Sequence, residues 1–389
     1  MEAEQFPEPG SSVREIPAAA LLERLEAGEA VTVLDTRRPA DFETWTLTHP
    51  NVTNVNVPFT EFLTEDGDPA EGVPDGVPEG PLVTCCAKGI SSLYVAKFLA
   101  QQGWEVEALD DGMRGWARLY EAREVASAGP ATVLQYHRPS SGCLAYLVIS
   151  GQDAAVIDPL RAFATRYAED AAARGATLRH ALDTHVHADH ISGLRAVSML
   201  TDAEAVLPAG ALDRGLAFDA ELVGDGDVIE VGDAEIEAVA IPGHTSEMTG
   251  YRVGDVFVTG DTLFTGSVAR PDLESGSAGA ADAARQLHDT LGSIAELPDD
   301  TVIAPGHTSP SEAASDDGTY TATLGELRGS LPAFSQDREA FVEATLADMP
   351  PRPNNFEEII ATNLGRASVD DDEAFELELG PNNCAATAD

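Results

Sequence analysis

Lysine is almost absent from this chain. Only Lys88 and Lys97 occur among 389 residues, and 67 acidic residues face 23 Lys and Arg, which gives a formal net charge of −44. Nucleic-acid phosphates would be repelled, so nucleic acid is excluded as a partner. The apolar content is an ordinary 43%, which excludes a disordered acidic chain. A uniform acidic bias predicts adaptation to multimolar salt, as in a halophile, where charges are screened within about 3 Å.

Long apolar runs are also missing, and cysteines are few. No stretch approaches the roughly 20 apolar residues that cross a bilayer, and Met1–Gln5 lacks the charged-then-apolar pattern of a signal peptide. Two of the four cysteines, Cys85 and Cys86, are adjacent, a spacing that rarely forms an unstrained disulfide. These absences predict a cytoplasmic protein in a reducing compartment, with no membrane partner.

Four potential metal ligands lie within six residues, in the segment 184–190, which reads THVHADH. Three of the nine histidines of the chain are concentrated there. Neutral imidazole suits Zn, Fe, Cu or Ni, and a carboxylate adds charge compensation for a divalent ion. A solvated polar loop is the alternative, but chance matches to a motif are usually looser than this. The segment therefore predicts a metal site.

Short β-like runs elsewhere end in a turn that carries one histidine or aspartate. Leu178–Leu182 leads into the dense segment, Ile236–Ile241 into Pro-Gly-His, Val256–Thr259 into Gly-Asp, and Thr301–Pro305 into Gly-His. Any one of these residues alone would be better explained as a turn or cap residue. Four repeats of the arrangement instead predict ligands gathered along one edge of a sheet. The seven candidate ligands are His185, His187, Asp189, His190, His244, Asp261 and His307.

Seven ligands in this order resemble the metallo-β-lactamase superfamily, over roughly residues 131–310. The resemblance implies an αββα sandwich with its metal centre along one edge. Glyoxalase II-like hydrolases of this superfamily would use all seven residues to hold two zinc ions and hydrolyse a thioester. Persulfide dioxygenases would bind one Fe(II) through His185, His244 and Asp261, which form the facial triad of non-haem iron oxygenases. In that branch the remaining four residues, His187, Asp189, His190 and His307, would be supporting residues or second-metal ligands.

Residues around the ligands favour the dioxygenase branch. The segment 184–193, THVHADHISG, resembles that branch, whereas glyoxalase II-like enzymes favour an aromatic residue before the Asp. The stretch Arg270–Asp272 also resembles the dioxygenases, and the resemblance implies that Arg270 is an active-site residue that binds substrate. Two departures are Ala269, where Gly is common, and Ser246-Glu247 after His244, where Pro-Gly is usual.

The first third of the chain carries a separate alternating α/β pattern. Val31–Asp35 and Pro81–Cys86 are typical of buried parallel strands, and a helical pattern follows from Leu93. Cys86 lies between a strand end and a helix start, where converging backbone N–H groups stabilise a thiolate or a persulfide. An inert buried cysteine is the alternative interpretation.

Residues 13–125 resemble the rhodanese fold. The resemblance is carried by Asp35–Arg37, by Asn54–Pro58 and by Gly112–Trp116. It implies a doubly wound parallel sheet in which Cys86 is the sulfur-carrying nucleophile. The loop that would bind the anionic sulfur donor comprises Ala87, Lys88, Gly89, Ile90 and Ser91, with Ser91 where an Arg is often found.

The sequence thus predicts a rhodanese-like domain at 13–125, a linker at 126–130 and a metal-binding domain at 131–310. A helical extension at 311–365 and an acidic tail at 366–389 follow. A chain of this length can hold two domains, each with its own core. Cys85 and Cys143 are expected in the cores, and Cys384 in the tail, without a role.

Three functions are consistent with these patterns. The first is iron-dependent oxidation of a low-molecular-weight thiol persulfide to sulfite and thiol, with one Fe(II), O2 as co-substrate, and sulfur transfer between Cys86 and thiosulfate or a thiol. A shared sulfur pool would explain the fusion, although domain pairing alone does not fix function. The second is a hydroxyacyl-thioester hydrolase with two zinc ions, and the third is a sulfur carrier or sensor. No interface signature is visible, and a homodimer is considered only as the commonest assembly.

Overall fold

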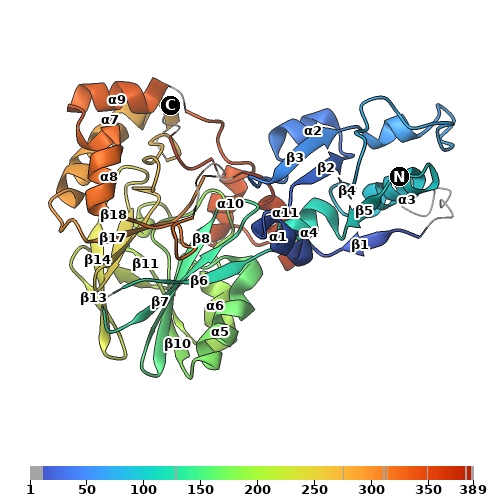
Figure 1. The fold of residues 1–389 in the computed structure, drawn as a ribbon. Coiled ribbons are helices and arrows are strands. Elements are labelled where there is room, and N and C mark those ends of the chain that lie inside the picture. The colour runs from blue at the N-terminus through green and yellow to red at the C-terminus, as the bar shows by residue number, and fades with distance from the viewer. Residues whose placement is uncertain are drawn as a thin grey trace. The chain divides into compact units, whose positions relative to one another are not determined.

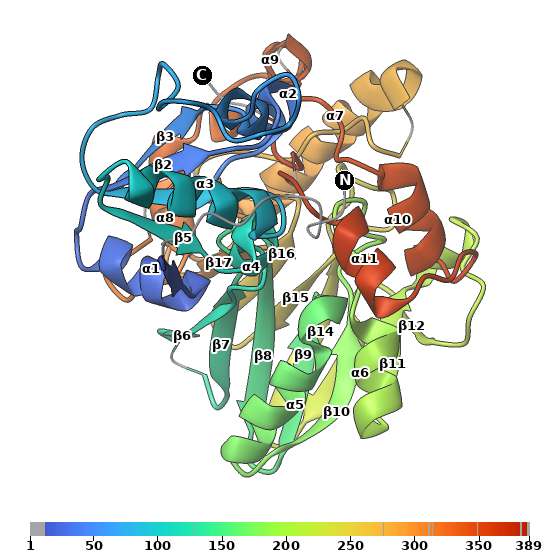
Figure 2. The same ribbon diagram turned by 90° about the vertical axis from the view of Figure 1, so that its right-hand side faces the viewer.

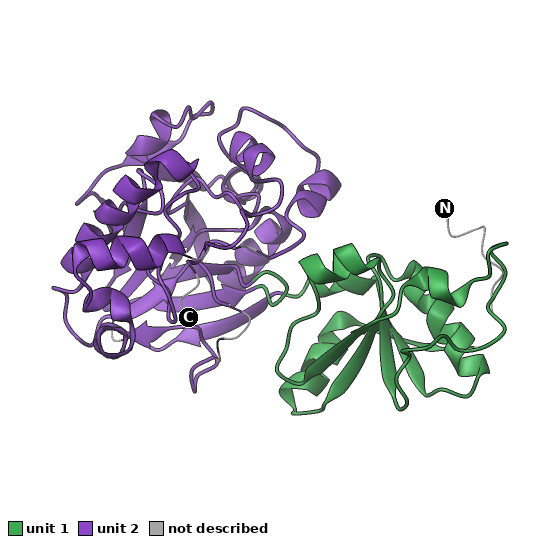
Figure 3. Ribbon diagram, turned by 90° about the horizontal axis from the view of Figure 1, so that it is seen from above, with its two compact units in different colours: residues 1–119, 138–141 green, residues 120–137, 142–389 purple. Residues whose placement is uncertain are grey.

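The computed structural model describes residues 12–386 except 128, 275, 310, 311, 313, 348 and 382, so Met1–Gln5 lie outside the described residues. The chain divides into two compact units, shown in Figure 3. Unit 1 comprises Met1–Leu119 with Arg138–Ser141, and unit 2 comprises Tyr120–His137 with Gly142–Asp389. Within the described residues, no helix combines the length and the apolar character needed to span a bilayer.

Unit 1 is built on a five-stranded sheet in which every neighbouring pair of strands is parallel, as predicted. The strand order is β1-β5-β4-β2-β3, and Figure 1 shows the helices beside it. The strands are β1 (Arg14–Ile16), β2 (Val31–Asp35), β3 (Val52–Asn56), β4 (Leu82–Cys85) and β5 (Val106–Leu109). The helices are α1 (Ala18–Glu26), α2 (Pro39–Thr44), the short η2 (Phe59–Phe62), α3 (Ile90–Gln101) and α4 (Gly112–Trp116).

Each face of this sheet has its own apolar cluster. Val33, Val83 and Cys85 pack with the apolar sides of α1 and α4, whereas Leu34 and Leu82 pack with α3 and η2. Successive side chains of a strand point to opposite faces, so a parallel sheet covered on both sides needs continuous apolar strands. Cys85 is fully buried, which confirms its expected place in the core.

Unit 2 consists of two sheets packed face to face. The seven-stranded sheet has the order β12-β11-β10-β9-β8-β7-β6 and the six-stranded sheet the order β13-β14-β15-β16-β17-β18. Its strands are β6 (Glu121–Val125), β7 (Thr132–His137), β8 (Leu144–Ser150), β9 (Asp153–Ile157), β10 (Thr177–Leu182), β11 (Glu204–Pro208), β12 (Glu221–Val223), β13 (Val228–Val231), β14 (Ala234–Ala240), β15 (Thr249–Val253), β16 (Val256–Gly260), β17 (Val302–Pro305) and β18 (Ala322–Thr323). One apolar cluster fills the space between the sheets, with Tyr146 and Val148 from the first and Tyr251 and Val258 from the second.

Helices cover the outer faces of both sheets, which completes the αββα sandwich predicted from the sequence. Figure 2 shows α5 (Ala164–Ala173) and α6 (Leu194–Thr201) along the seven-stranded sheet, where they contact β8, β10 and β11. On the six-stranded sheet, α7 (Gly276–Ile294), α8 (Leu324–Ser330) and α9 (Arg338–Ala347) share an apolar cluster with β16 and β17. The short helices η3 (Arg161–Phe163), η4 (Ala209–Leu212) and η5 (Pro332–Phe334) complete these layers.

Segment 126–130, which the sequence suggested as an interdomain linker, instead joins two strands of unit 2. β6 and β7 pair antiparallel on either side of it, with Val125 opposite Val133, and both of these valines are buried in the core between the sheets. The boundary between the units lies between Leu119 and Tyr120. The small residues, Gly and Pro of a hairpin connection resemble those of a linker, because both need turn-forming residues.

The acidic segment 366–389 also differs from the tail that was expected. After α10 (Phe356–Asn363), residues Asp371–Leu377 form α11, whose start is capped by the Asp370 carboxylate accepting from Glu373 N. Ala374 and Phe375 are buried, and Ala385 pairs with Ala269. A few apolar residues at helical spacing are therefore sufficient to fold this segment onto unit 2 despite its charge.

Candidate metal centre and sulfur-carrier loop

The candidate ligands lie directly after four strands of unit 2. His185, His187, Asp189 and His190 follow β10, His244 follows β14, Asp261 follows β16 and His307 follows β17. All seven side chains are buried. The two sheets deliver them to one edge because each of these strands ends there, and a rigid strand end fixes the position of the following turn.

Three of the seven side chains converge with free coordinating atoms. Asp261 Oδ2 lies 3.8 Å from His185 Nε2 and 3.7 Å from His244 Nε2. Neither His185 Nε2 nor Asp261 Oδ2 has a hydrogen-bond partner, although both are buried. Leaving such atoms unsatisfied costs about 1–3 kcal/mol each. A metal ion about 2 Å from each atom fits these separations and would satisfy all three side chains.

The opposite atom of each of these three side chains is already held by the protein. His185 Nδ1 lies 2.9 Å from Thr184 Oγ1, and His244 Nδ1 donates to the Arg270 carbonyl oxygen at 2.9 Å. Asp261 Oδ1 accepts from His307 Nδ1 at 2.6 Å. Such outer bonds fix the ring tautomer and the direction of the free atom, so the triad is oriented before a metal binds.

His307 bridges two carboxylates. Its Nδ1 contacts Asp261 Oδ1, and its Nε2 contacts Asp189 Oδ2 at 2.8 Å. Burial alone would lower the pKa of His307, but the charges of Asp261 and Asp189 outweigh it and raise that pKa well above its usual value. With Oδ1 held by His307, Asp261 keeps one oxygen, Oδ2, without a hydrogen-bond partner.

His187 lies beside the triad, with its ring centroid 4.2 Å from that of His185, and its other side is held by Asp158. Its Nε2 lies 3.1 Å from Asp158 Oδ1. Asp158 has φ +53° and also accepts from Thr184 N at 2.7 Å. A buried non-glycine residue in this backbone region is strained, which is common where a functional loop is held in place. Asp158 is not among the residues predicted from the sequence, although it too follows an apolar run, at the end of β9.

The C-terminal helices hold the ligand loop from the other side. Asn363 Nδ2 donates to the backbone oxygens of His187 at 3.0 Å and His190 at 2.9 Å. Glu378 Oε2 accepts from Ile191 N at 3.2 Å. These residues lie more than 170 positions away from the loop in the chain, so no local pattern could have linked them to it.

Two cysteines lie closer to the centre than the sequence analysis expected. Cys143 is buried in the core, as predicted, yet its Sγ lies 3.4 Å from Asp189 Oδ2. Cys384 was expected in a tail without a role, but it is fully buried, within ligand range of Asp261 and His307. The correction for Cys384 arises because its segment pairs with residues 268–270 beside the metal centre.

Arg270 also differs from expectation. Its side chain is buried, its Nε donates to Asp272 Oδ1 at 2.8 Å, and its Nη1 donates to the carbonyl oxygens of Pro351 at 2.8 Å and Asn383 at 2.9 Å. These side-chain bonds fix the position of the Arg270 backbone. The carbonyl oxygen of Arg270 in turn accepts the hydrogen bond from His244 Nδ1, so Arg270 helps to orient that ring. This geometry favours a positioning role for Arg270 over the substrate contact that the resemblance implied.

We expect an Arg270→Met variant to lose about 3–5 kcal/mol of unfolding free energy, because Asp272 would stay buried without its main partner. Chemical denaturation followed by fluorescence measures this loss. Arg352→Met is the matched control: Arg352 also contacts Asp272, at 3.4 Å, but its side chain is 33% exposed, so its loss should stay below about 1 kcal/mol. Equal losses in the two variants would contradict the positioning role.

The predicted sulfur-carrier loop of unit 1 connects β4 to α3. Cys86 is 4% exposed, and its Sγ accepts a hydrogen bond from Ser92 Oγ at 3.2 Å. Gly89 adopts φ +75° and leads into the first turn of α3, so the loop residues 87–91 curve around the thiol at the amino end of a helix. This is an environment that favours an anionic sulfur. Ser92, which the sequence analysis passed over, is the only side chain recorded as donating to Cys86 among the described residues.

Gly112 is required by the packing of this loop. It has φ +53°, and a Cβ built on it would lie 2.1 Å from the Cys86 carbonyl oxygen. We expect Gly112→Ala to destabilise unit 1 by more than about 3 kcal/mol, since the clash adds to a backbone strain of about 1–3 kcal/mol. Gly103→Ala is the control, because it has φ +93° with nothing within 4 Å of the added Cβ. Denaturant unfolding measures the loss of unfolding free energy in both variants. Gly103→Ala should lose only the strain contribution, and a similar loss in Gly112→Ala would show that no clash occurs.

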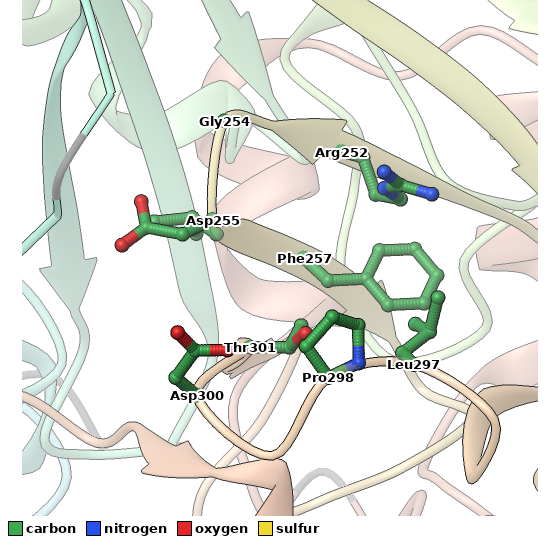
Figure 4. A pocket seen from close by; sticks show the side chains of 9 residues that line it. Arg252, Gly254, Asp255, Phe257, Leu297, Pro298, Asp300 and Thr301 are labelled. Atoms are coloured by element: carbon green, nitrogen blue, oxygen red, sulfur yellow. The ribbon is translucent and has the colours of Figure 1, made fainter.

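Two hollows on unit 2 lie away from these residues. One, of about 260 Å³, lies around the β15–β16 turn and is lined by residues that include Arg252, Phe257 and Pro298 (Figure 4). A neighbouring hollow of about 280 Å³ is bounded by β14 and α7. None of the lining residues is a candidate ligand, so neither hollow marks the metal centre.

Comparison with known proteins relates each unit to a family. Residues 139–307 match the metallo-beta-lactamase superfamily, and residues 17–119 match the rhodanese-like domain. Mitochondrial persulfide dioxygenase ETHE1 from Mus musculus is 28% identical over 249 residues, which cover 62% of this chain and 91% of that protein. Hydroxyacylglutathione hydrolase from Rhodospirillum rubrum is 31% identical over 231 residues, which cover 57% and 82%. The crystal structure of ETHE1 from Myxococcus xanthus is 27% identical, with a TM-score of 0.52 over 64% of this chain and 100% of that one.

Proposed function

This chain belongs to the metallo-β-lactamase superfamily, and from that premise we propose that unit 2 is an iron-dependent persulfide dioxygenase. The reaction would be RSSH + O2 + H2O → RSH + sulfite + 2H⁺, where R is a low-molecular-weight thiol. The sulfur–sulfur bond breaks, the terminal sulfur is oxidised to sulfite, and O2 accepts four electrons. The similarity to persulfide dioxygenases supports this reaction, and the similarity to a hydroxyacylglutathione hydrolase supports hydrolysis as the competing candidate.

The observation that carries the proposal is the single available oxygen of Asp261. A two-metal hydrolase centre would use Asp261 and His307 as metal ligands together with the other five candidates. Here Asp261 Oδ1 and both nitrogens of His307 are engaged in hydrogen bonds of 2.6 and 2.8 Å. His185 Nε2 and Asp261 Oδ2 have no hydrogen-bond partner, as is also true of His187 Nδ1, Asp189 Oδ1 and His190 Nε2. With His244 Nε2, the first two make the two-His-one-carboxylate donor set of non-haem Fe(II) oxygenases, which supports the dioxygenase.

The surrounding residues would perform three tasks. His185, His244 and Asp261 would hold the ferrous ion, which when bound would bring the persulfide and O2 together and relay electrons between them. Hydrogen bonds with Thr184 and with the Arg270 carbonyl oxygen hold the orientation of the His185 and His244 rings, respectively. Because Asp189 and Asp261 flank His307, this histidine is placed to give or take a proton at Asp261 Oδ1. Burial of the whole set excludes bulk water from the reacting sulfur.

We propose that unit 1 supplies or removes the substrate sulfur. The Cys86 thiolate would attack the outer sulfur of thiosulfate, releasing sulfite and leaving a Cys86 persulfide. A thiolate RS⁻ would then take that sulfur as RSS⁻ and restore the Cys86 thiolate, and both steps can run in reverse. The rhodanese-like match and the Ser92 hydrogen bond to Cys86 support this assignment.

Metal content and oxygen uptake test the proposal together. Protein purified without oxygen, in high salt, should contain one iron per chain and consume O2 with a thiol persulfide while producing sulfite. Two zinc ions per chain, no oxygen uptake and hydrolysis of a hydroxyacyl thioester would overturn the dioxygenase and establish the hydrolase.

A further inference from the structure

Glu247 joins the two turns that carry the histidines of the triad. It lies three residues after His244, and its side chain is completely buried. Its Oε1 accepts a hydrogen bond at 3.0 Å from Val186 N, the peptide N–H between the first two histidines of the ligand loop. The same oxygen accepts from Arg214 Nη1 at 2.5 Å. Glycine, which is usual at this position, has no side chain to make these contacts, so they arise from this departure in the sequence.

A second bond from the same segment completes the attachment of His185. Thr249 N donates to the Thr184 carbonyl oxygen at 2.9 Å, on the other side of His185 from the bond made by Glu247. The backbone is thus held immediately before and after His185 by residues that follow His244. Because these two histidines supply two of the three donors of the triad, the separation of their rings depends on segment 247–249.

Burial leaves little room for water to replace Glu247. Val186 is 3% exposed, and the Arg214 side chain is 11% exposed. Gly210 packs directly behind Glu247, since a Cβ added to this glycine would lie 2.7 Å from Glu247 Cβ. Buried N–H groups are nearly always satisfied, and a bond to a carboxylate is stronger than one to a neutral acceptor. Loss of this carboxylate would leave Val186 N without its acceptor and release the ligand loop.

We propose that Glu247 is a positioning residue of the metal centre: by accepting from Val186 N, its carboxylate sets the spacing of His185 and His244 before a metal binds. The ion pair with Arg214 holds the carboxylate in place, and the bond to Val186 does the positioning. Groups that hold metal ligands from outside are typically worth about 10–100-fold in metal affinity. The proposal rests on the metal site assigned to unit 2 and not on its reaction, so it applies equally to one iron or two zinc ions.

Titration of the metal-free, full-length protein with Co²⁺ in high salt measures this effect without relying on activity. The visible absorption bands to follow are those that His244→Ala abolishes, because they report the triad. Glu247→Met keeps the volume of the side chain but offers no acceptor, so it should weaken Co²⁺ binding by about 10–100-fold and shift these bands.

Glu247→Gln should bind Co²⁺ as the unmodified protein does. Val186 and Arg214 both donate to Oε1, which the amide keeps. The amide nitrogen would take the place of Oε2, which has no hydrogen-bond partner. This variant therefore removes the charge of Glu247 and retains the bond that the proposal requires.

Two further variants separate positioning from stability. Glu247→Met leaves Arg214 buried without its partner, which also destabilises the fold. When Glu247→Met is combined with Arg214→Met, the ion pair is replaced by apolar side chains, yet Val186 N still lacks its acceptor, so Co²⁺ binding should stay as weak as in the single variant. Glu274→Ala is the matched control and should bind normally. Its carboxylate accepts from Ser246 N at 2.6 Å in the same turn, but it is 26% exposed, so water can replace it.

Recovery of Co²⁺ binding in the double variant would overturn the proposal, because the unpaired charge and not the lost bond to Val186 would then explain the effect. Equal losses in Glu247→Gln and Glu247→Met would overturn it as well, since the charge alone would be responsible. A protein that takes up no oxygen, yet binds Co²⁺ more weakly as Glu247→Met, would refute the proposed dioxygenase and leave this inference standing.

Discussion

A His244→Ala variant is expected to purify without iron and to lose more than about 100-fold in persulfide-dependent oxygen uptake, because it removes one of the three donors of the triad. Of the neighbouring histidines, His307 is bonded to two carboxylates, and His187 to Asp158 through Nε2. Sulfur transfer from thiosulfate should be unchanged, since Cys86 lies in unit 1. An oxygen electrode, iron analysis and a thiocyanate-forming transfer assay measure the three quantities.

His288→Ala controls for the general effect of removing a histidine from unit 2. His288 lies on α7, where it contacts the Phe341 ring and the Gln336 carbonyl oxygen and is not a candidate ligand. Its iron content and oxygen uptake should match those of the unmodified protein. Full oxygen uptake in His244→Ala would refute the ligand assignment, and loss of iron in both variants would indicate unfolding instead.

Cys86→Ser is expected to lose sulfur transfer and to keep oxygen uptake, the reverse of His244→Ala. Removal of a covalent nucleophile should lower the sulfur-transfer rate by more than about 10³-fold, because a serine hydroxyl cannot carry a persulfide under these conditions. Oxygen uptake with a preformed thiol persulfide should persist, whereas uptake driven by thiosulfate and thiol should stop. Mass spectrometry after incubation with thiosulfate should show one added sulfur atom per chain in the unmodified protein and none in the variant.

Cys85→Ala is the control for this experiment, as the neighbouring cysteine is also buried but packs in the apolar cluster with α1 and α4. It should cost stability without stopping transfer. If Cys85→Ala abolished the persulfide and Cys86→Ser kept it, the nucleophile would be Cys85 and not Cys86.

The convergence of the candidate ligands at one edge of unit 2 could be predicted from the sequence, because each of them follows the end of a strand. His244, Asp261 and His307 each follow a short apolar run and a glycine, and such a pattern is visible without knowledge of the partners. The parallel order of unit 1 was predictable for a similar reason, since Val31–Asp35 and Leu82–Cys85 are apolar on both faces. Periodicity and turn chemistry are properties of neighbouring residues.

The residues that were missed act over long separations in the chain. Cys143 is 46 positions from Asp189, and Asn363 is 173 positions from His190. Cys143 precedes an apolar strand, and this position predicts only a core residue. Arg270 lies in a family motif that predicts a substrate contact, and only its tertiary partners indicate a positioning role. The acidic C-terminal segment was misjudged because composition does not reveal a few well-placed apolar side chains such as Phe375.

The pairing of residues 383–386 with 268–270 also constrains when the metal centre can mature. A nascent chain that has been synthesised as far as His307 has all seven candidate ligands, yet it lacks Asn363, Glu378 and Asn383, which hold the ligand loop and Arg270. The ligands would then be exposed on an incomplete scaffold, open to whichever cation is most abundant. Selective loading of the proposed ferrous ion would therefore follow the emergence of residue 386 from the ribosome, and an extension fused directly after that segment would delay it.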